Sequence, residues 1–214
     1  MNYEKIIELR KIVATRIEEE VLKDDFILNV SSLVTIHERL FKNILPNYGH
    51  FRKDNLEKPE YILNEESVHY SDYSIIPVLL RMIIQEEKQI DYQKLSDLEK
   101  VKNIAVFTSK IWQIHPFIEG NTRTTCVFIE KYLMSLGYNI NNDIFKEHAE
   151  YFRNALVRAN YENKDLLVEK NIKPLLNFFI KALLDKEVIL DENDLFIPEL
   201  FNKETKTKKR ILNK

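Results

Sequence analysis

The sequence predicts an all-α fold, a helical bundle with one small β-hairpin flap. Only 3 glycines and 6 prolines interrupt the 214 residues, and a chain so poor in both favours helices. Apolar residues also recur at intervals of three and four through most of the chain, which is the spacing of a buried helix face. The exception is the stretch 50–73, where this period disappears.

Three helices are expected in the first half of the chain. The first covers about 6–21, and the second follows a cap at Ser31 or Ser32. The third covers 75–89.

The stretch between the second and third helices predicts the hairpin. Residues 60–63 and 67–70 are short runs rich in β-forming side chains, and 64–66 reads as a turn between them. This segment is therefore expected to project from the helices as a flap.

The second half predicts four more helices. They are expected over 95–114, 122–136, 143–160 and 165–184, with Pro174 as a kink in the last. The first two are strongly apolar and so are expected to be buried.

Three regions follow from this organisation. Residues 1–24 form an N-terminal helix, 25–185 the main domain, and 186–214 a C-terminal extension whose basic tail is expected to be a solvated, frayed end.

Composition excludes several classes of protein. Three glycines so far apart in the sequence cannot form a dinucleotide-binding fingerprint or a P-loop. A net charge of −2 gives no reason to expect nucleic acid as a partner, and a single cysteine excludes a Cys-based zinc site. No apolar run is long enough for a membrane span, and no secretory leader is evident. We therefore expect a cytoplasmic protein without a membrane partner, and the richness in Ile, Asn, Lys and Glu suggests a bacterial source.

One short connection between two buried helices contains several polar residues that are suited to binding and catalysis. A new helix begins within two residues of Asn121, so its free N–H groups form an anion site. Gly120 lets the backbone approach a phosphate, while Thr122 and Arg123 add a donor and a charge on the first turn.

Two further groups lie on the same connection. Glu119 is suited to hold Mg²⁺ beside bound phosphates, and His115 is suited to act as a general base. A base, a metal carboxylate and an anion site within nine residues indicate phosphoryl or nucleotidyl transfer.

This segment, His-Pro-Phe-Ile-Glu-Gly-Asn-Thr-Arg at 115–123, resembles the Fic family signature His-x-Phe-x-(Asp/Glu)-Gly-Asn-(Gly/Lys)-Arg-x-x-Arg. Residues 48–52, Tyr-Gly-His-Phe-Arg, are similar to the family's Ala-Gly-x-Phe-Arg, which precedes its flap. The resemblance spans roughly 25–185 and includes 151–161, which looks like the helix that borders the family's nucleotide pocket.

The resemblance implies a protein adenylyltransferase. AMP would pass from ATP to a Tyr, Thr or Ser hydroxyl of a target protein or of the enzyme itself, with release of pyrophosphate. His115 would take the hydroxyl proton and Glu119 would bind Mg²⁺. The anion hole would comprise Gly120, Asn121, Thr122 and Arg123, and the flap would dock the target by strand addition. The docking residues would be Tyr61, Ile62, Leu63, Val68 and His69.

The sequence departs from the signature at two positions. Thr122 replaces Gly or Lys, which argues against the phosphorylating branch of the family. Cys126 replaces the final Arg, which in the family holds the γ-phosphate, and a thiol cannot replace that charge. Either ATP is held less firmly there or another cation substitutes. The candidates are Arg153, Arg158 and Lys131.

Regulation is also inferred from the resemblance. Glu192 falls near the position of a C-terminal inhibitory motif, and a small antitoxin-like inhibitor or a homo-oligomer stays open. The run that begins at His37 starts like a zinc-protease motif but lacks its second histidine, so His37 is expected on a helix surface.

Two alternatives to adenylyl transfer stay open. The first keeps the fold with another chemistry, which is transfer of a different nucleotide or phosphate group, or removal of AMP. The second is a nucleotide-binding regulator with little transferase activity, as Cys126 would suggest.

Overall fold

The computed structural model describes residues 3–140 and 142–201, and within them the chain is helical. The basic tail at 203–214 lies outside the described residues. In chain order the elements are α1 (Tyr3–Val21), α2 (Val30–Phe41), η1 (Tyr61–Leu63), η2 (Tyr73–Ile75), α3 (Ile76–Lys88), η3 (Tyr92–Lys94), α4 (Asp97–Ile114), α5 (Asn121–Ser135), α6 (Asp143–Glu147), α7 (Ala149–Asn160), η4 (Lys164–Leu166), α8 (Lys173–Leu183), η5 (Glu192–Leu195) and α9 (Pro198–Phe201), where η marks a 3₁₀ turn.

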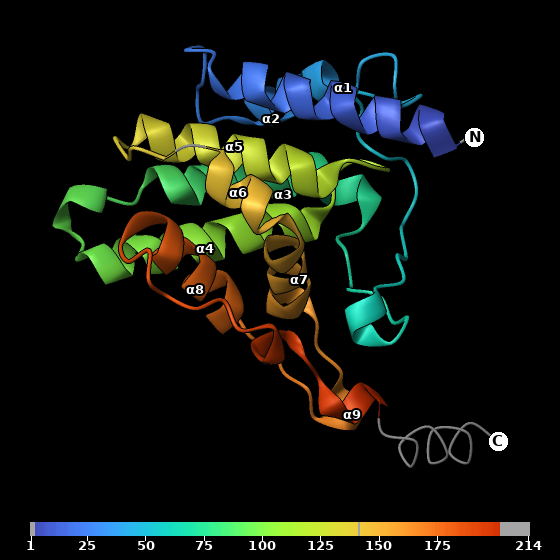
Figure 1. Ribbon diagram of the computed structural model, residues 1–214, viewed down its shortest axis with the longest axis vertical. Coiled ribbons are helices and arrows are strands. Elements are labelled where there is room, and N and C mark those ends of the chain that lie inside the picture. Colours follow the sequence, from blue (N-terminus) through green and yellow to red (C-terminus); the bar gives the residue numbers. More distant parts are fainter. Residues whose placement is uncertain (1–2, 141, 202–214) are drawn as a thin grey trace.

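The helices stack in layers around α4 (Figure 1). Helices α1 and α2 form one outer layer and pack on α5, while α4 packs on α3, α5, α7 and α8. The expected burial of α4 and α5 is confirmed, because Ile104, Ile111, Val127 and Leu133 are each fully buried. Among the described residues, no helix is long and apolar enough to span a bilayer.

The starts of α2 and α4 are fixed by polar side chains. Ser96 and Glu99 form a reciprocal capping box at α4. At α2 the cap is Asn29, whose side chain accepts the Ser32 N–H at 2.8 Å, so the expected cap at Ser31 or Ser32 is wrong by two or three residues.

Helix α1 belongs to the same core as the rest of the bundle. The Lys131 ammonium of α5, 3% exposed, donates to the carbonyls of Glu20 and Lys23 at 2.7 Å each and so caps the end of α1. Arg39 of α2 pairs with the buried Glu20 carboxylate at 2.9 Å. Lys131 is therefore engaged at this helix end, and its candidacy as a substitute phosphate ligand is not supported.

Two of the expected helices have different limits. The stretch 143–160 is divided into α6 and α7 at His148 (φ −114°, ψ 30°), and Phe145 and Phe152 meet edge to face across the break. Pro174 does not kink a helix but stands in the first turn of α8, where its missing N–H costs nothing. The residues before α8 instead form η4 and a turn at Leu167 (φ 55°).

The prediction of a β-hairpin over residues 60–70 is wrong. No strand is present in the part of the chain that the structure describes, and residues 60–66 form a tight loop closed by a bond from Glu60 N–H to Glu66 O (3.0 Å). Asn64 and Glu65 take left-handed conformations (φ 51° and 70°), so the chain turns too sharply for a ladder to continue. We call residues 57–70 the flap segment.

Candidate active site

The connection between α4 and α5, residues 115–120, is bounded by two left-handed residues. His115 (φ 50°) ends α4, and Gly120 (φ 83°) is the N-cap of α5. A side chain at Gly120 is excluded by more than its φ, because a Cβ there would lie 2.5 Å from Cε2 of Phe41. The glycine thus allows the loop to lie directly on the Phe41 ring.

Asn121 holds the loop together from inside. Its side chain accepts the Phe117 N–H at 2.9 Å and donates to the Phe117 carbonyl at 2.7 Å. Both of its polar side-chain atoms are therefore used within the loop, so only its backbone N–H is left to face a ligand. Phe117 itself is buried, as expected.

His37 braces the loop from α2. Its Nδ1 accepts the Gly49 N–H at 2.9 Å, so Nε2 carries the proton and donates to the Glu119 carbonyl at 3.0 Å. The ring stacks on Phe117 with centroids 3.7 Å apart. Burial lowers the pKa of His37 to about 4, so the ring is neutral at physiological pH. The expectation that His37 lies on a helix surface is wrong, because its neighbours on this face come from distant parts of the chain.

Arg52 braces the other side of the loop. Its Nε donates to the His115 carbonyl at 2.8 Å, its Nη2 donates to the carbonyls of Ile114 and Ser71, and its backbone N–H donates to Pro116 O. Sequence reasoning assigned Arg52 no role in the site. The signal that could have pointed to Arg52 is its place in the 48–52 run, which resembles a family motif.

His115 lies under the flap segment. It is 4% exposed, and its ring stacks on Tyr70 at 4.0 Å and meets Trp112 edge-on at 5.3 Å. Its Nδ1 is buried and has no hydrogen-bond partner. Burial, followed by the positive charge of Lys58, lowers the pKa of His115 to about 3. The imidazole is therefore neutral at physiological pH and can accept a proton.

The anion site is expected at the first turn of α5, which leaves N–H groups available. The first bond of the helix runs from Thr124 N–H to Gly120 O at 2.9 Å, and the N–H groups before it have no partner within the helix. The Arg123 guanidinium lies 4.7 Å from the centroid of Phe41. The Thr122 hydroxyl accepts the Trp112 indole N–H at 2.9 Å, so it is engaged with α4.

Glu119 stands beside this turn with its side chain 59% exposed, and Lys58 of the flap segment pairs with it at 3.0 Å. The described residues contain no group of three or more His, Cys, Asp or Glu side chains that could hold a metal. One carboxylate fits Mg²⁺ only where phosphate oxygens supply further ligands. The donor set therefore suits a metal that arrives with a nucleotide.

The flap segment is also fixed to α7. Arg153 pairs with the buried Glu60 carboxylate at 2.5 Å. The Tyr61 hydroxyl donates to Glu150 at 2.7 Å and accepts from Asn154. Of the three cations considered for the γ-phosphate, Arg153 is the one whose charge reaches His115, where it lowers the pKa.

The expected docking residues of the flap segment face different ways. Tyr61 and His69 are exposed and Ile62 is half-buried, whereas Leu63 and Val68 are buried in the core. The last two therefore anchor the segment.

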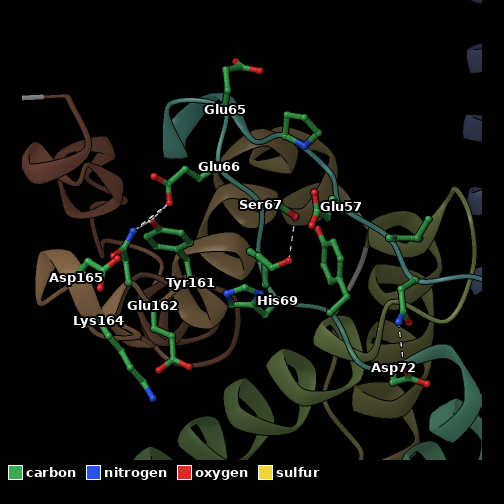
Figure 2. Close-up of a pocket in the computed structure, with 16 residues that line it drawn as sticks. Glu57, Glu65, Glu66, Ser67, His69, Asp72, Tyr161, Glu162, Lys164 and Asp165 are labelled. Carbon is green, nitrogen blue, oxygen red and sulfur yellow. Dashed lines mark hydrogen bonds between the residues drawn. The ribbon is translucent and has the colours of Figure 1, made fainter. Parts of the chain in front are cut away.

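A groove of about 1150 Å³ lies between the flap segment and residues 161–165 (Figure 2). The Tyr161 hydroxyl donates to Glu66 at 2.6 Å, and Figure 2 shows Glu66 directed toward Tyr161 and Glu65 directed away from it. Tyr70, which stacks on His115, is among the residues that line this groove.

Cys126 and Glu192 belong to different elements, α5 and η5. Cys126 lines a cavity of about 170 Å³ together with Arg123 of α5 and Glu18 of α1. Glu192 begins η5, which packs on α7 and α8. Among the described residues no hydrogen bond or ion pair joins Glu192 to 115–123, so its inhibitory role stays a prediction.

Comparison with known proteins identifies relatives of this arrangement. Residues 27–133 match the model of the Fic/DOC family. The protein adenylyltransferase VbhT of Bartonella schoenbuchensis is 24% identical over 163 residues, which are 75% of this chain and 32% of VbhT. The chain thus spans about a third of that curated relative.

Solved structures share the fold. The BepC protein of Bartonella tribocorum with bound AMPPNP has a TM-score of 0.66 at 17% identity, over 85% of this chain and 87% of that one. The N-terminal Fic domain of a Bartonella quintana effector with bound ADP has a TM-score of 0.62 at 22% identity, over 82% of this chain and 85% of that one.

Proposed function

Because this chain belongs to the Fic/DOC family, we propose that it is a protein adenylyltransferase that moves AMP from ATP to a hydroxyl of a target protein or of itself. The observation that carries the proposal is the placement of a neutral His115 six residues before the free N-terminus of α5. That arrangement supplies a proton acceptor and an anion site on one rigid loop. The nucleotides named for the two solved relatives agree with it.

In the proposed reaction the hydroxyl oxygen attacks the α-phosphorus of ATP. A new oxygen–phosphorus bond forms, the bond between the α-phosphorus and its bridging oxygen breaks, and pyrophosphate leaves. The hydroxyl proton goes to the His115 imidazole. The N–H groups of the first turn of α5 and the Arg123 guanidinium stabilise the negative charge on the phosphates. Glu119 would hold Mg²⁺, which supplies further charge neutralisation on phosphate oxygens when bound.

Tyr70 of the flap segment stacks on the face of the His115 ring, so a target hydroxyl would approach the imidazole at its edge. We place target contacts on the exposed side chains of Tyr61 and His69 and on the half-buried Ile62, which lie on this same segment. Leu63 and Val68 would position the segment from within.

The test is transfer of label from ATP labelled at the α-phosphate, in parallel with ATP labelled at the γ-phosphate, to proteins of a host extract and to the enzyme itself. We expect α-label on protein with wild type, none with His115→Ala, and normal transfer with the exposed control His50→Ala. Normal transfer by His115→Ala would show that the assigned base is wrong. Label from the γ-position would favour phosphoryl transfer, and nucleotide binding without any transfer would favour the regulator.

A further inference from the structure

Lys58 is held at the centre of the site. Its ammonium lies 3.0 Å from a Glu119 oxygen, and its side chain is only 25% exposed. Its backbone N–H donates to the Ser67 hydroxyl at 2.9 Å, and Glu60, two residues later, is fixed by Arg153. The flap segment is thus fastened at Lys58 and at Glu60, which holds the Lys58 backbone where its side chain reaches Glu119.

The charge of Lys58 acts on more than Glu119. It lowers the pKa of His115, second only to burial, and it also lowers the pKa of Glu60 against the larger effect of burial. An ammonium that acts on the proton acceptor and pairs with the metal carboxylate is close to the place where the phosphates of a nucleotide would lie. None of the sequence motifs assigned it a role.

Lys58 and a divalent metal would compete for the same carboxylate. Glu119 is the one carboxylate on the 115–120 loop, and a metal bound there needs the oxygen that Lys58 now contacts. A lysine has a flexible four-carbon stem and three donors, so its ammonium can turn from a carboxylate to a phosphate without backbone movement.

On the basis of the proposed function, we propose that Lys58 binds the nucleotide phosphates as an internal cation that shares Glu119 with the divalent metal. Nucleotide then binds with or without the metal, because one of the two cations is always present beside Glu119. This residue would make nucleotide binding by this chain only weakly dependent on metal.

The test is calorimetric titration of the intact protein with AMPPNP, once with Mg²⁺ and once with EDTA. We expect removal of Mg²⁺ to weaken binding by a modest factor in wild type and by about tenfold more in Lys58→Met, since a charge-assisted hydrogen bond is lost. Lys58→Arg and the exposed control Lys53→Met should behave as wild type. Glu119→Gln should keep binding in EDTA and lose the gain from Mg²⁺.

The outcomes separate this proposal from the adenylyltransferase function. If EDTA weakens binding equally in wild type and Lys58→Met, the role of Lys58 is overturned while the adenylyltransferase proposal stands. If Lys58→Met in that case also melts at a lower temperature, the ion pair between Lys58 and Glu119 has a structural role only. If wild type binds no AMPPNP under either condition, both proposals fail.

Discussion

The carbonyl of His115 accepts a hydrogen bond from Nε of Arg52, 2.8 Å away, across 63 positions of sequence. The same guanidinium donates to the carbonyls of Ser71, the residue after the flap segment, and of Ile114 at the end of α4. Arg52 therefore ties the chain at the end of the flap segment to the 115–120 connection.

Replacement of Arg52 should cost both stability and activity. Arg52→Met leaves several buried carbonyls without a donor, and we expect a loss of about 2–4 kcal/mol in the free energy of unfolding. Transfer activity should fall further than stability explains, because His115 loses its anchor. Denaturant unfolding and the label-transfer assay measure the two effects, with exposed Lys53→Met as the control. Wild-type transfer by Arg52→Met would refute the positioning role.

Gly120 and Gly137 offer a matched pair of positions for testing the turn that begins α5. Both have positive φ, but a Cβ at Gly137 would meet nothing within 4 Å, whereas one at Gly120 would strike Phe41. Gly137→Ala should therefore show backbone strain alone, about 1 kcal/mol. Gly120→Ala should lose about 1–3 kcal/mol more from the clash and should weaken AMPPNP binding.

The double variant Gly120→Ala/Phe41→Leu separates the clash with Phe41 from the backbone strain. Relief of the clash should recover part of the stability, while the strain at φ 83° stays. Equal losses for Gly120→Ala and Gly137→Ala would mean that contact with Phe41 does not set the loop position.

The sequence predicted the parts of this site that are contiguous in the chain. His115, Glu119 and the α5 N-terminus could be recognised because a nine-residue run carries them all. Arg52, His37 and Lys58 act on that run from 57 or more positions away. Arg52 lies in the recognised 48–52 run, which gave no hint of this contact, and no local pattern marks His37 or Lys58. Their roles emerge only when α2 and the flap segment pack on the loop.

The fold shows the same division. Helices with a strong apolar period were predicted, and their ends were misplaced where a single side chain decides them, as Asn29 does for α2. The flap segment has strand-forming residues, yet Leu63 and Val68 are buried in the core and the turn at Asn64 is left-handed, so tertiary packing overrides the propensity. The break at His148 has neither Gly nor Pro to mark it.

Glu130 makes the stability of α5 depend on pH. The side chain is fully buried, neither carboxylate oxygen has a hydrogen-bond partner, and burial raises its pKa to about 7. A group whose pKa is higher in the folded state stabilises the fold at low pH and loses that contribution as pH rises through 4.5 to 7. Wild type should thus lose about 2–3 kcal/mol between pH 5 and pH 8 relative to Glu130→Gln.

Thermal or denaturant unfolding at the two pH values measures this difference, and a constant cost of the buried amide cancels from it. Exposed Glu147→Gln serves as the control and should follow wild type. The buried histidines act with the opposite sign, because His37 has a lowered pKa and so loses stability as pH falls. Parallel pH profiles for wild type and Glu130→Gln would contradict the prediction.

The presence of Cys126 in place of an arginine leads to a prediction about the relative affinities for ATP and ADP. Its thiol lines the small cavity that Arg123 and Glu18 share, and burial raises its pKa well above the usual value, so it stays neutral. A neutral thiol gives the γ-phosphate no charge-assisted bond, and ATP and ADP should bind wild type with similar affinity. Cys126→Arg should create a preference for ATP of about tenfold, while Cys126→Ser should create none. Calorimetry with AMPPNP and ADP measures both affinities. A strong preference for the triphosphate in wild type would mean that another cation, such as Arg153 or Lys58, already holds the γ-phosphate.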